Sequence, residues 1–466
     1  MPEPTGQAPL TPALRLAGGR CDDRTMTQNP APETNVTAEA EVVDICRDLI
    51  RIDTTNPGDH SGPGERVAAE YVAGLLAEVG VEPVVLESHP KRTSLVARIS
   101  GADPGRPPLL IHGHLDVVPA NAGDWRRDPF GGEIADGCVW GRGAVDMKDM
   151  DAMMLAVMRQ RLREGRMPKR DVVLVFTADE EAGGKWGAGF LAQEHPGLFE
   201  GVTEAIGEVG GFSVPIGDQR VYVLQTAEKG LAWMRLTATG TAGHGSMIHD
   251  DNAVTALAEA VARIGRHDWP VRLPDSVRAF LEEASDALGV EFNPDDPGTV
   301  IGKLGAMGRM IGAVVKNTAN PTGLKAGYKV NVIPQSATAE VDGRFLPGYE
   351  EEFFAEIDRL LGTAVKREFI HHDIALETTA DGDLYDAMSA ALLGEDPQGR
   401  IVPYCLSAGT DAKWFSRLGI RCFGFSPLKL PPDLDFSGMF HGIDERVPVD
   451  GLRFGVRVLD RFLDLA

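Results

Sequence analysis

Five short motifs in this chain place histidines and acidic residues at spacings that suit the binding of divalent cations. In the first motif, His114 and Asp116 lie two residues apart, just after a strand predicted at 108–113. This spacing places both side chains on one face of an extended chain. A histidine that binds a metal ion usually donates its second ring N–H to an oxygen, and Asp116 is placed to accept it. Taken alone, the pair more often marks a turn with a capping aspartate, because short motifs have many false positives.

The second motif is a glycine-flanked acidic loop at residues 141–149, which leads into a helix predicted at 150–162. Asp149 stands directly before this helix and is the better candidate for its N-cap residue. Asp146 is therefore left without a capping role. Its two carboxylate oxygens suit the bridging of two cations.

The third motif follows a strand predicted at 172–176, which is apolar throughout and therefore expected to be buried on both faces. Asp179, Glu180 and Glu181 come shortly after it. Three adjacent acids at the end of a buried strand are electrostatically costly unless cations or protons offset their charge. A solvated loop is the alternative interpretation.

The last two motifs say little when each is taken alone. Glu208 follows a short strand predicted at 204–206, and His441 lies in the loop 439–448, where a lone histidine would normally be structural. Together the motifs are more informative, because three of them follow predicted strands, and open α/β sheets bind ligands beyond the carboxyl ends of their strands. We therefore expect the five motifs to converge on one site.

The charges of the candidate ligands predict a site for two divalent metal ions. Two neutral histidines contribute no charge, whereas three carboxylates and one bridging hydroxide together balance two such ions. Because the ligands are nitrogen and oxygen atoms and no thiolate is included, zinc is the first candidate. Cobalt and manganese remain alternatives.

The elements around these motifs predict an α/β fold. Helices are predicted at 40–52 and 64–79, and strands are predicted at 94–99 and 108–113. Helices and strands alternate again from about residue 381 to an amphipathic helix at 449–465. Such alternation predicts a mostly parallel, layered sheet.

The stretch between these parts has a different character. Strands are predicted near 231–238, 323–332, 337–345 and 366–374, with helices at 252–264 and 350–361. This βα…ββαβ order predicts a smaller α/β domain, residues 228–377, inserted into a discontinuous catalytic domain of residues 38–227 and 378–466. The irregular stretch 268–322 is assigned to the smaller domain as an insertion.

The composition fits a folded enzyme with a small substrate. The 466 residues are too many for one ordinary core, and the net charge of −23 opposes binding to nucleic acid. Five cysteines without a C-x-x-C pair predict neither a disulfide framework nor a thiolate zinc site, and they fit a reducing cytoplasm.

No apolar run approaches the ~18 residues of a membrane span, so no membrane partner is expected. Residues 1–37 lack the apolar core of a secretory signal and are predicted to form a flexible tail.

The order of the motifs resembles that of a dinuclear zinc metallopeptidase family, which contains carboxypeptidase G, aminoacylases, acetylornithine deacetylase and succinyl-diaminopimelate desuccinylase. The resemblance covers about residues 42–465 and includes Trp125 and the Asp-Pro-Phe segment 128–130, ahead of the second motif. One departure is Gly207, because an Asn or Asp is frequent before the glutamate in that family. Another is the long insertion from about Asp268.

The resemblance implies two metal sites that share one bridging carboxylate. The shared ligand would be Asp146, with His114 and Glu208 completing one site and Glu181 and His441 completing the other. The resemblance also implies a cis peptide bond after Asp146.

The resemblance further implies catalytic roles. Glu180 becomes the general base, and Asp116 supports His114. His244 matches a family histidine that reaches the active site of a partner protomer and helps to polarise the scissile carbonyl; a turn histidine is the alternative. The smaller domain would then be a lid and dimerisation domain, and the chain would form a homodimer.

Four other residues resemble family positions that hold the substrate, namely Asn331, Arg344, Gly409 and Thr410. Arg344 suits a substrate carboxylate because its planar guanidinium can pair with both oxygens. A surface arginine at a strand edge is the alternative.

The resulting hypothesis is a metal-dependent hydrolase that cleaves an amide bond adjacent to a free carboxylate, as a carboxypeptidase or N-acyl-amino-acid deacylase does. A metal-bridged hydroxide would attack and Glu180 would carry the proton. A dipeptidase or aminopeptidase of the same family is an alternative, although the family associates Glu at position 208 with acylases and carboxypeptidases. A dinuclear phosphoesterase would need a phosphate cradle, which the sequence lacks. A non-catalytic binding protein on this fold is disfavoured by the intact Glu180 and ligand set.

Overall fold

The computed structural model describes residues 36–305 and 307–466. The flexible tail predicted at 1–37 therefore lies outside the described residues, apart from its last two positions. The described residues contain a ten-stranded sheet and a four-stranded sheet, with two smaller pieces of sheet beside them. No described helix is long and apolar enough to cross a membrane.

The ten-stranded sheet is parallel in its centre and antiparallel towards its edges. Its strands lie in the order β1 (Val84–His89), β2 (Arg92–Ile99), β6 (Val172–Thr177), β3 (Leu109–His114), β7 (Glu204–Gly207), β18 (Arg421–Gly424), β9 (Gln219–Glu228) and β16 (Leu376–Glu377), and β9 also pairs with β8 (Ser213–Ile216) and β17 (Arg400–Leu406). Strands β6, β3, β7 and β18 run parallel to one another. The predicted α/β class with a mostly parallel central sheet is confirmed.

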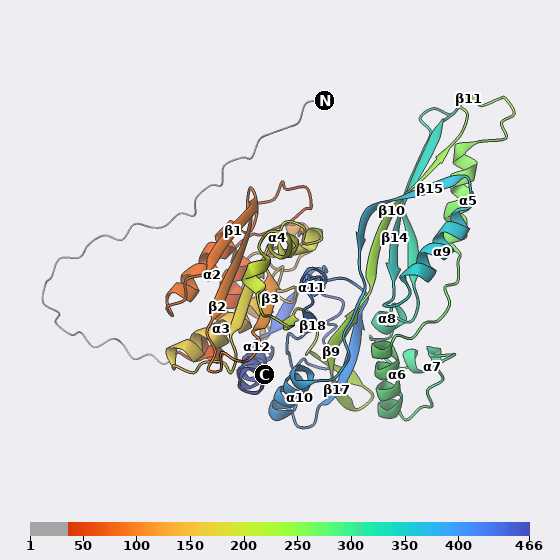
Figure 1. The fold of residues 1–466 in the computed structure, drawn as a ribbon. Helices are drawn as coiled ribbons and strands as arrows, with labels where there is room; N and C mark the ends of the chain where they lie inside the picture. The colour runs from red at the N-terminus through yellow and green to blue at the C-terminus, as the bar shows by residue number, and fades with distance from the viewer. Residues whose placement is uncertain (1–35, 306) are drawn as a thin grey trace, which may run out of the picture. The chain divides into compact units, whose positions relative to one another are not determined.

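Helices cover both faces of this sheet (Figure 1). On one face, α4 (Ala188–Glu194) and α11 (Ala412–Ser416) pack against Leu110, Val173 and Val175. The larger core on the other face includes α1 (Ala38–Arg51), α2 (Arg66–Ala77), α3 (Lys148–Arg163), α10 (Asp383–Glu395) and α12 (Val449–Leu465). Because both faces are buried, β6 is a nearly continuous apolar run rather than an alternating one.

The four-stranded sheet is antiparallel and has its own core. Its spatial order is β12 (Thr318–Ala326), β14 (Ser336–Phe345), β10 (Gly230–Thr239) and β15 (Val365–Asp373). Helices α5 (Ala253–Gly265) and α9 (Glu350–Leu361) pack on it, and Asn252 caps α5 by accepting from the N–H groups of Val254 and Thr255. The chain order β10-α5-β12-β14-α9-β15 matches the predicted βα…ββαβ pattern.

The helices of the long insertion pack differently from the prediction. Residues of α6 (Asp275–Leu288), α7 (Gly298–Ile301) and α8 (Met307–Gly312) belong to the core of the ten-stranded sheet. Phe280 and Leu281 of α6 are almost fully buried there. The assignment of this insertion to the smaller domain is wrong for these helices, because α6 packs against β8, β9 and β17 of the ten-stranded sheet, α7 packs against α6, and α8 packs against α7.

Short elements complete the described structure. A three-stranded piece consists of β4 (Glu133–Ala135), β5 (Cys138–Trp140) and β19 (Arg446–Pro448), and a two-stranded piece consists of β11 (Gly243–His244) and β13 (Val332–Ile333). Single 3-10 turns lie at Ala122–Asp124, Glu180–Ala182 and Pro196–Phe199.

Candidate metal centre

The parallel centre of the large sheet brings two predicted ligands and the predicted general base together. Strand β3 lies between β6 and β7, and all three run in the same direction, so their carboxyl ends meet at one edge. His114 ends β3, Glu180 lies in the turn after β6, and Glu208 directly follows β7. Ligand atoms of these three residues lie within 4.8 Å of one another.

A second group consists of Asp146, Glu181 and His441, whose ligand atoms also lie within 4.8 Å of one another. Asp146 faces both groups, because its Oδ1 is 3.2 Å from His114 Nε2 and its Oδ2 is 3.3 Å from His441 Nε2. Glu181 Oε2 is 3.0 Å from the same His441 nitrogen. One carboxylate thus stands between two sets of donors, an arrangement that suits two cations.

The electrostatics of this cluster favour positive charge. Burial raises the pKa of Glu180 well above its usual value, and the charge of Glu208 raises it further. Burial and then the charge of Asp146 raise the pKa of Glu181 to about 7. Hydrogen bonds to Asp146 and Glu181 raise the pKa of His441 to about 10. Buried acids that crowd together bind protons or metal cations, and the nitrogen and oxygen donors present here fit divalent metal ions.

Asp116 supports the site in a different way from the one predicted. His114 Nδ1 lies 3.0 Å from the main-chain oxygen of Asp116 and 3.7 Å from its carboxylate, so the main-chain oxygen accepts the ring N–H. The Asp116 carboxylate instead accepts from the N–H groups of Glu180 and Glu181, at 3.1 and 3.2 Å, and from Asn56 Nδ2 at 2.8 Å. Asp116 therefore holds the turn that carries both glutamates. Asn56 was not singled out, because nothing in its own turn-forming segment indicates a long-range partner.

The loop that carries Asp146 is held by Glu445, a second residue that the sequence did not single out. The Glu445 carboxylate accepts from Gly143 N, Val145 N and Arg142 Nη1 at 3.0, 2.8 and 2.7 Å. The peptide bond between Asp146 and Met147 is cis, as the resemblance implied. Glu445 lies four residues after His441, so one segment supplies both a candidate ligand and the support of the loop opposite it.

The role expected of Asp149 is wrong. Helix α3 begins at Lys148 and its N-cap position is Met147, so Asp149 lies inside the first turn. The start of this helix was predicted two residues too late, because its apolar periodicity begins only at Met150 and the first turn contains polar residues. An acid in the first turn still has a physical reason, since it interacts favourably with the helix dipole.

A cleft of about 370 Å³ opens above the two groups of ligands. Three of the four predicted substrate-holding residues line it, namely Arg344, Gly409 and Thr410. The Arg344 guanidinium donates to both carboxylate oxygens of Asp342, at 2.7 and 3.2 Å, which fixes its orientation. The cleft also has an apolar wall formed by Leu231, Trp233, Met310, Leu406 and Phe440.

His244 and Asn331 lie together, but not in this cleft. They belong to the short β11 and β13 region beyond the end of β10, where both side chains are exposed. Leu231 and Trp233, at the start of β10, line the cleft, and the ten residues of β10 span about 33 Å. Figure 1 shows β11 at the end of the four-stranded sheet that is far from β9. These two residues therefore cannot reach the metal ligands of their own chain without a large rearrangement.

The comparisons with known proteins show the family of this chain. The sequence model of Peptidase family M20/M25/M40 matches residues 110–465. The chain belongs to this family. Aminoacylase-1 of Sus scrofa is 27% identical over 412 residues, which cover 87% of this chain and 90% of that protein. The N-fatty-acyl-amino acid synthase/hydrolase PM20D1 of Mus musculus is 27% identical over 420 residues, which cover 85% of this chain and 82% of that protein.

A solved structure agrees at the level of the fold. The M20 family metallo-carboxypeptidase Sso-CP2 from Sulfolobus solfataricus superposes with a TM-score of 0.70 at 19% identity, over 91% of this chain and 99% of that one. The predicted family is thus confirmed. This M20 chain is a metallohydrolase that acts on amide bonds.

Proposed function

We propose that this M20 hydrolase cleaves an amide bond next to a free carboxylate, in an N-acyl amino acid or at the end of a peptide. The observation that carries the proposal is that Arg344 lines the same cleft as Glu180 and both groups of metal ligands. An arginine already oriented by Asp342 presents its remaining N–H groups to a carboxylate in a defined direction. The substrate's charged end and its scissile bond can thus occupy one cleft.

Glu180 is the proposed proton carrier. Its carboxylate lines the cleft beside the proposed ligands His114 and Glu208, with Oε2 3.9 Å from His114 Nε2, where it can take a proton from an attacking water. Asp116 fixes the main chain at Glu180, so the carboxylate is held in place. Glu180 accepts the proton of the attacking water and returns it to the leaving amine. When bound, two divalent cations supply Lewis acidity and lower the pKa of that water.

Several finer assignments belong to the same proposal. We assign Asp146 as the bridging ligand, His114 and Glu208 to one metal, Glu181 and His441 to the other, and zinc as the metal. His244 and Asn331 would act on the cleft of a second protomer, which makes the chain a homodimer in which the four-stranded sheet with α5 and α9, within residues 228–377, supplies the lid and the interface. The cytoplasmic location and the domain boundaries remain predictions.

The nature of the acyl group follows from the cleft. Its apolar wall includes Trp233 and Phe440, and apolar side chains favour an apolar group by removing it from water. The relatives named as an aminoacylase and as an N-fatty-acyl-amino acid synthase/hydrolase support this assignment. We therefore favour N-acyl amino acids with an apolar acyl group over dipeptides, whose free amino group would face this wall.

A hydrolysis screen tests the proposal. N-acyl amino acids, their carboxyl-amidated counterparts, and dipeptides would be offered to protein loaded with zinc, cobalt or manganese. We expect cleavage of the N-acyl amino acids, with at least a tenfold loss when the carboxylate is amidated, because a hydrogen bond to a charged group contributes about 1.5–3 kcal/mol. Arg344→Ala should abolish this preference without removing metal. Equal cleavage of acids and amides by the wild type would refute the carboxylate requirement.

A further inference from the structure

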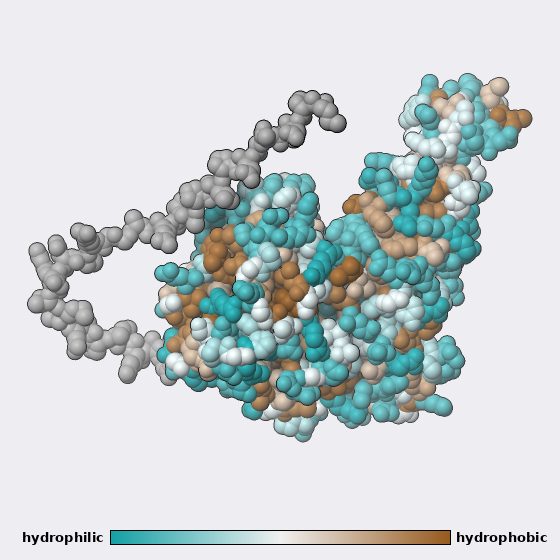
Figure 2. Space-filling view, viewed as in Figure 1, coloured by the Kyte–Doolittle hydropathy of each residue, from teal (hydrophilic) through white to brown (hydrophobic). Residues whose placement is uncertain are grey.

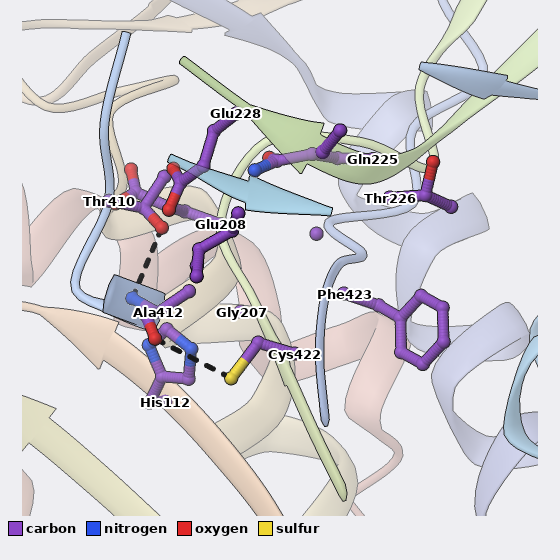
Figure 3. A pocket seen from close by; sticks show the side chains of 13 residues that line it. His112, Gly207, Glu208, Gln225, Thr226, Glu228, Thr410, Ala412, Cys422 and Phe423 are labelled. Carbon is purple, nitrogen blue, oxygen red and sulfur yellow. Dashed lines mark hydrogen bonds between the residues drawn. The ribbon is translucent and has the colours of Figure 1, made fainter. Parts of the chain in front are cut away.

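A small polar cavity lies behind Glu208, on the side away from the open cleft of the proposed active site. Its volume is about 10 Å³, which is room for one water molecule. Residues from five neighbouring strands, β3, β7, β18, β9 and β16, and from the loop before α11 line it. Figure 3 shows His112, Glu208, Glu228 and Thr410 gathered on one side of this cavity, with Phe423 on the other.

The side chains around this cavity include polar atoms without partners. Both carboxylate oxygens of Glu228, Nε2 of His112 and Oε1 of Gln225 have no hydrogen-bond partner among the described residues. Glu228 and His112 are only 1% and 2% exposed. A buried polar group without a partner costs about 1–3 kcal/mol, so several such groups around one cavity indicate that a small polar ligand satisfies them.

A water molecule fits these partners better than a cation does. The buried His112 ring leaves Nε2 without a partner, and a water molecule can either donate to a ring nitrogen or accept from its N–H group. The positive charge of Lys413 already acts on Glu228. A ligand here must both donate hydrogen bonds and accept them and need not bring charge, which describes water.

The neighbouring glycine is the reason why His112 can reach the cavity. A Cβ atom at Gly207 would lie 2.3 Å from both Cε1 and Nε2 of His112, too close for the ring to stay in place. Gly207 is also the residue directly before Glu208. The departure from the family at position 207 and the buried imidazole are thus complementary features of this chain.

We propose that this cavity binds one ordered water molecule that links Glu228 and His112 and positions Glu208 for metal binding. Glu228 and His112 are positioning residues, because they act through Glu208 and touch neither substrate nor metal. The inference rests on the proposed role of Glu208 as a metal ligand. It goes beyond that role because it assigns a function to an acid that no step of the hydrolysis uses.

Metal titration of the Glu228→Gln variant tests the proposal. This substitution keeps the volume of the side chain. It replaces one carboxyl oxygen, which can accept a hydrogen bond, with an NH2 group, which can only donate one. We expect one of the two metal-binding steps to weaken about 10- to 100-fold, the usual cost of losing an outer partner of a ligand, while the other step stays unchanged. Competition with a chromophoric chelator measures both steps, and thermal unfolding of the metal-free variant should show a folded protein.

Two further variants separate positioning from general stability. Asp396→Asn also alters a buried acid, which accepts from Arg220 and Tyr222, but it lies at the other end of β9 and should leave both metal steps unchanged. Gly207→Ala should weaken the same step as Glu228→Gln by displacing the His112 ring. In a His112→Ala background, Gly207→Ala should have little further effect, because the colliding ring is gone.

The outcomes distinguish this proposal from the one on which it rests. Unchanged metal affinity in Glu228→Gln, or a high-resolution structure of the metal-loaded wild type without density in the cavity, would overturn the water site alone. Density that scatters anomalously after rubidium is added would assign a cation and also overturn it. Failure of the wild type to bind any metal would instead overturn the proposed metal centre.

Discussion

The metal centre and the far end of the four-stranded sheet both carry residues suited to chemistry, yet they differ in burial and completeness. At the centre, side chains from five separate segments converge, and their carboxylates and imidazoles face one another within a few ångströms. At the far end, His244 has Ser246 Oγ as its nearby partner, at 2.9 Å, and stays exposed. Figure 2 shows hydrophobic surface at this end, where Met247, Ile248 and Val330 are exposed.

One chain therefore brings the metal-ligand groups together, but it leaves the proposed catalytic residue His244 apart from them. Crowded buried acids are unfavourable without cations, so the centre is complete only as a metal complex. An exposed histidine surrounded by exposed apolar side chains lacks the low-dielectric surroundings that make a hydrogen-bond donor effective in catalysis. It would gain them by docking against a second protomer.

The largest effect is expected from Asp146→Ala. Because Asp146 faces both groups of ligands, its loss should remove both metal ions and all measurable hydrolysis. Metal per chain, measured by mass spectrometry after gel filtration, and the initial rate check this. Asp136→Ala, an exposed acid in the turn between β4 and β5, is the control and should keep both metals. Two metals in Asp146→Ala would show that the two groups are independent sites.

A smaller loss is expected from Glu180→Gln, which should retain both metals. Proton transfer by a positioned side chain contributes about 10²–10⁴-fold, so kcat should fall by that factor. The neighbouring Glu181→Gln should instead weaken metal binding, because Glu181 lies 3.0 Å from His441 Nε2. Loss of metal from Glu180→Gln would make Glu180 a ligand and remove it as the general base.

His244→Ala probes the other side of the comparison. Removal of one donor to the oxyanion costs about 10²–10³-fold in kcat, and metal content should not change. Mixing His244→Ala with the inactive Asp146→Ala protein should restore part of the activity, because a mixed dimer contains one site with an intact metal centre and an intact histidine from its partner. Full activity of His244→Ala alone would show that His244, at the far end of the four-stranded sheet, has no catalytic role.

The smallest expected effect is the pH dependence of the unfolding free energy that results from the burial of Glu228 near the metal centre. Burial raises the pKa of Glu228 to about 8, above its ordinary value of 4.5. The folded state therefore holds this proton more tightly than the unfolded state, so the contribution to stability is complete below pH 4.5 and is lost as pH rises through about 8. Metal-free Glu228→Gln, which stays neutral, should lose less unfolding free energy than the wild type over this range in urea titrations. Identical pH profiles would contradict the burial of an ionisable Glu228.

Local pattern was enough to predict most elements and all five candidate ligands. Strands were predicted at 108–113 and 172–176 and are found at Leu109–His114 and Val172–Thr177, and the acids after them stand out because charge is costly at the end of a buried strand. The ends of helices were less predictable. The start of α3 was misplaced because a first turn can be polar while the helix still packs from its second turn onward.

Only the tertiary structure decided which segments meet. The supports of the site come from residues far away in the chain, such as Asn56 for Asp116 and Glu445 for the loop at Gly143, and no local pattern encodes a partner that is 60 or 302 residues away. The same holds for α6, whose amphipathic sequence specifies an apolar face but not which sheet it covers. The sequence by itself determined the donors and their chemistry, because these depend on residue type and local spacing. The fold determined their distances, their burial and their separation from His244, because these depend on how strands and loops pack.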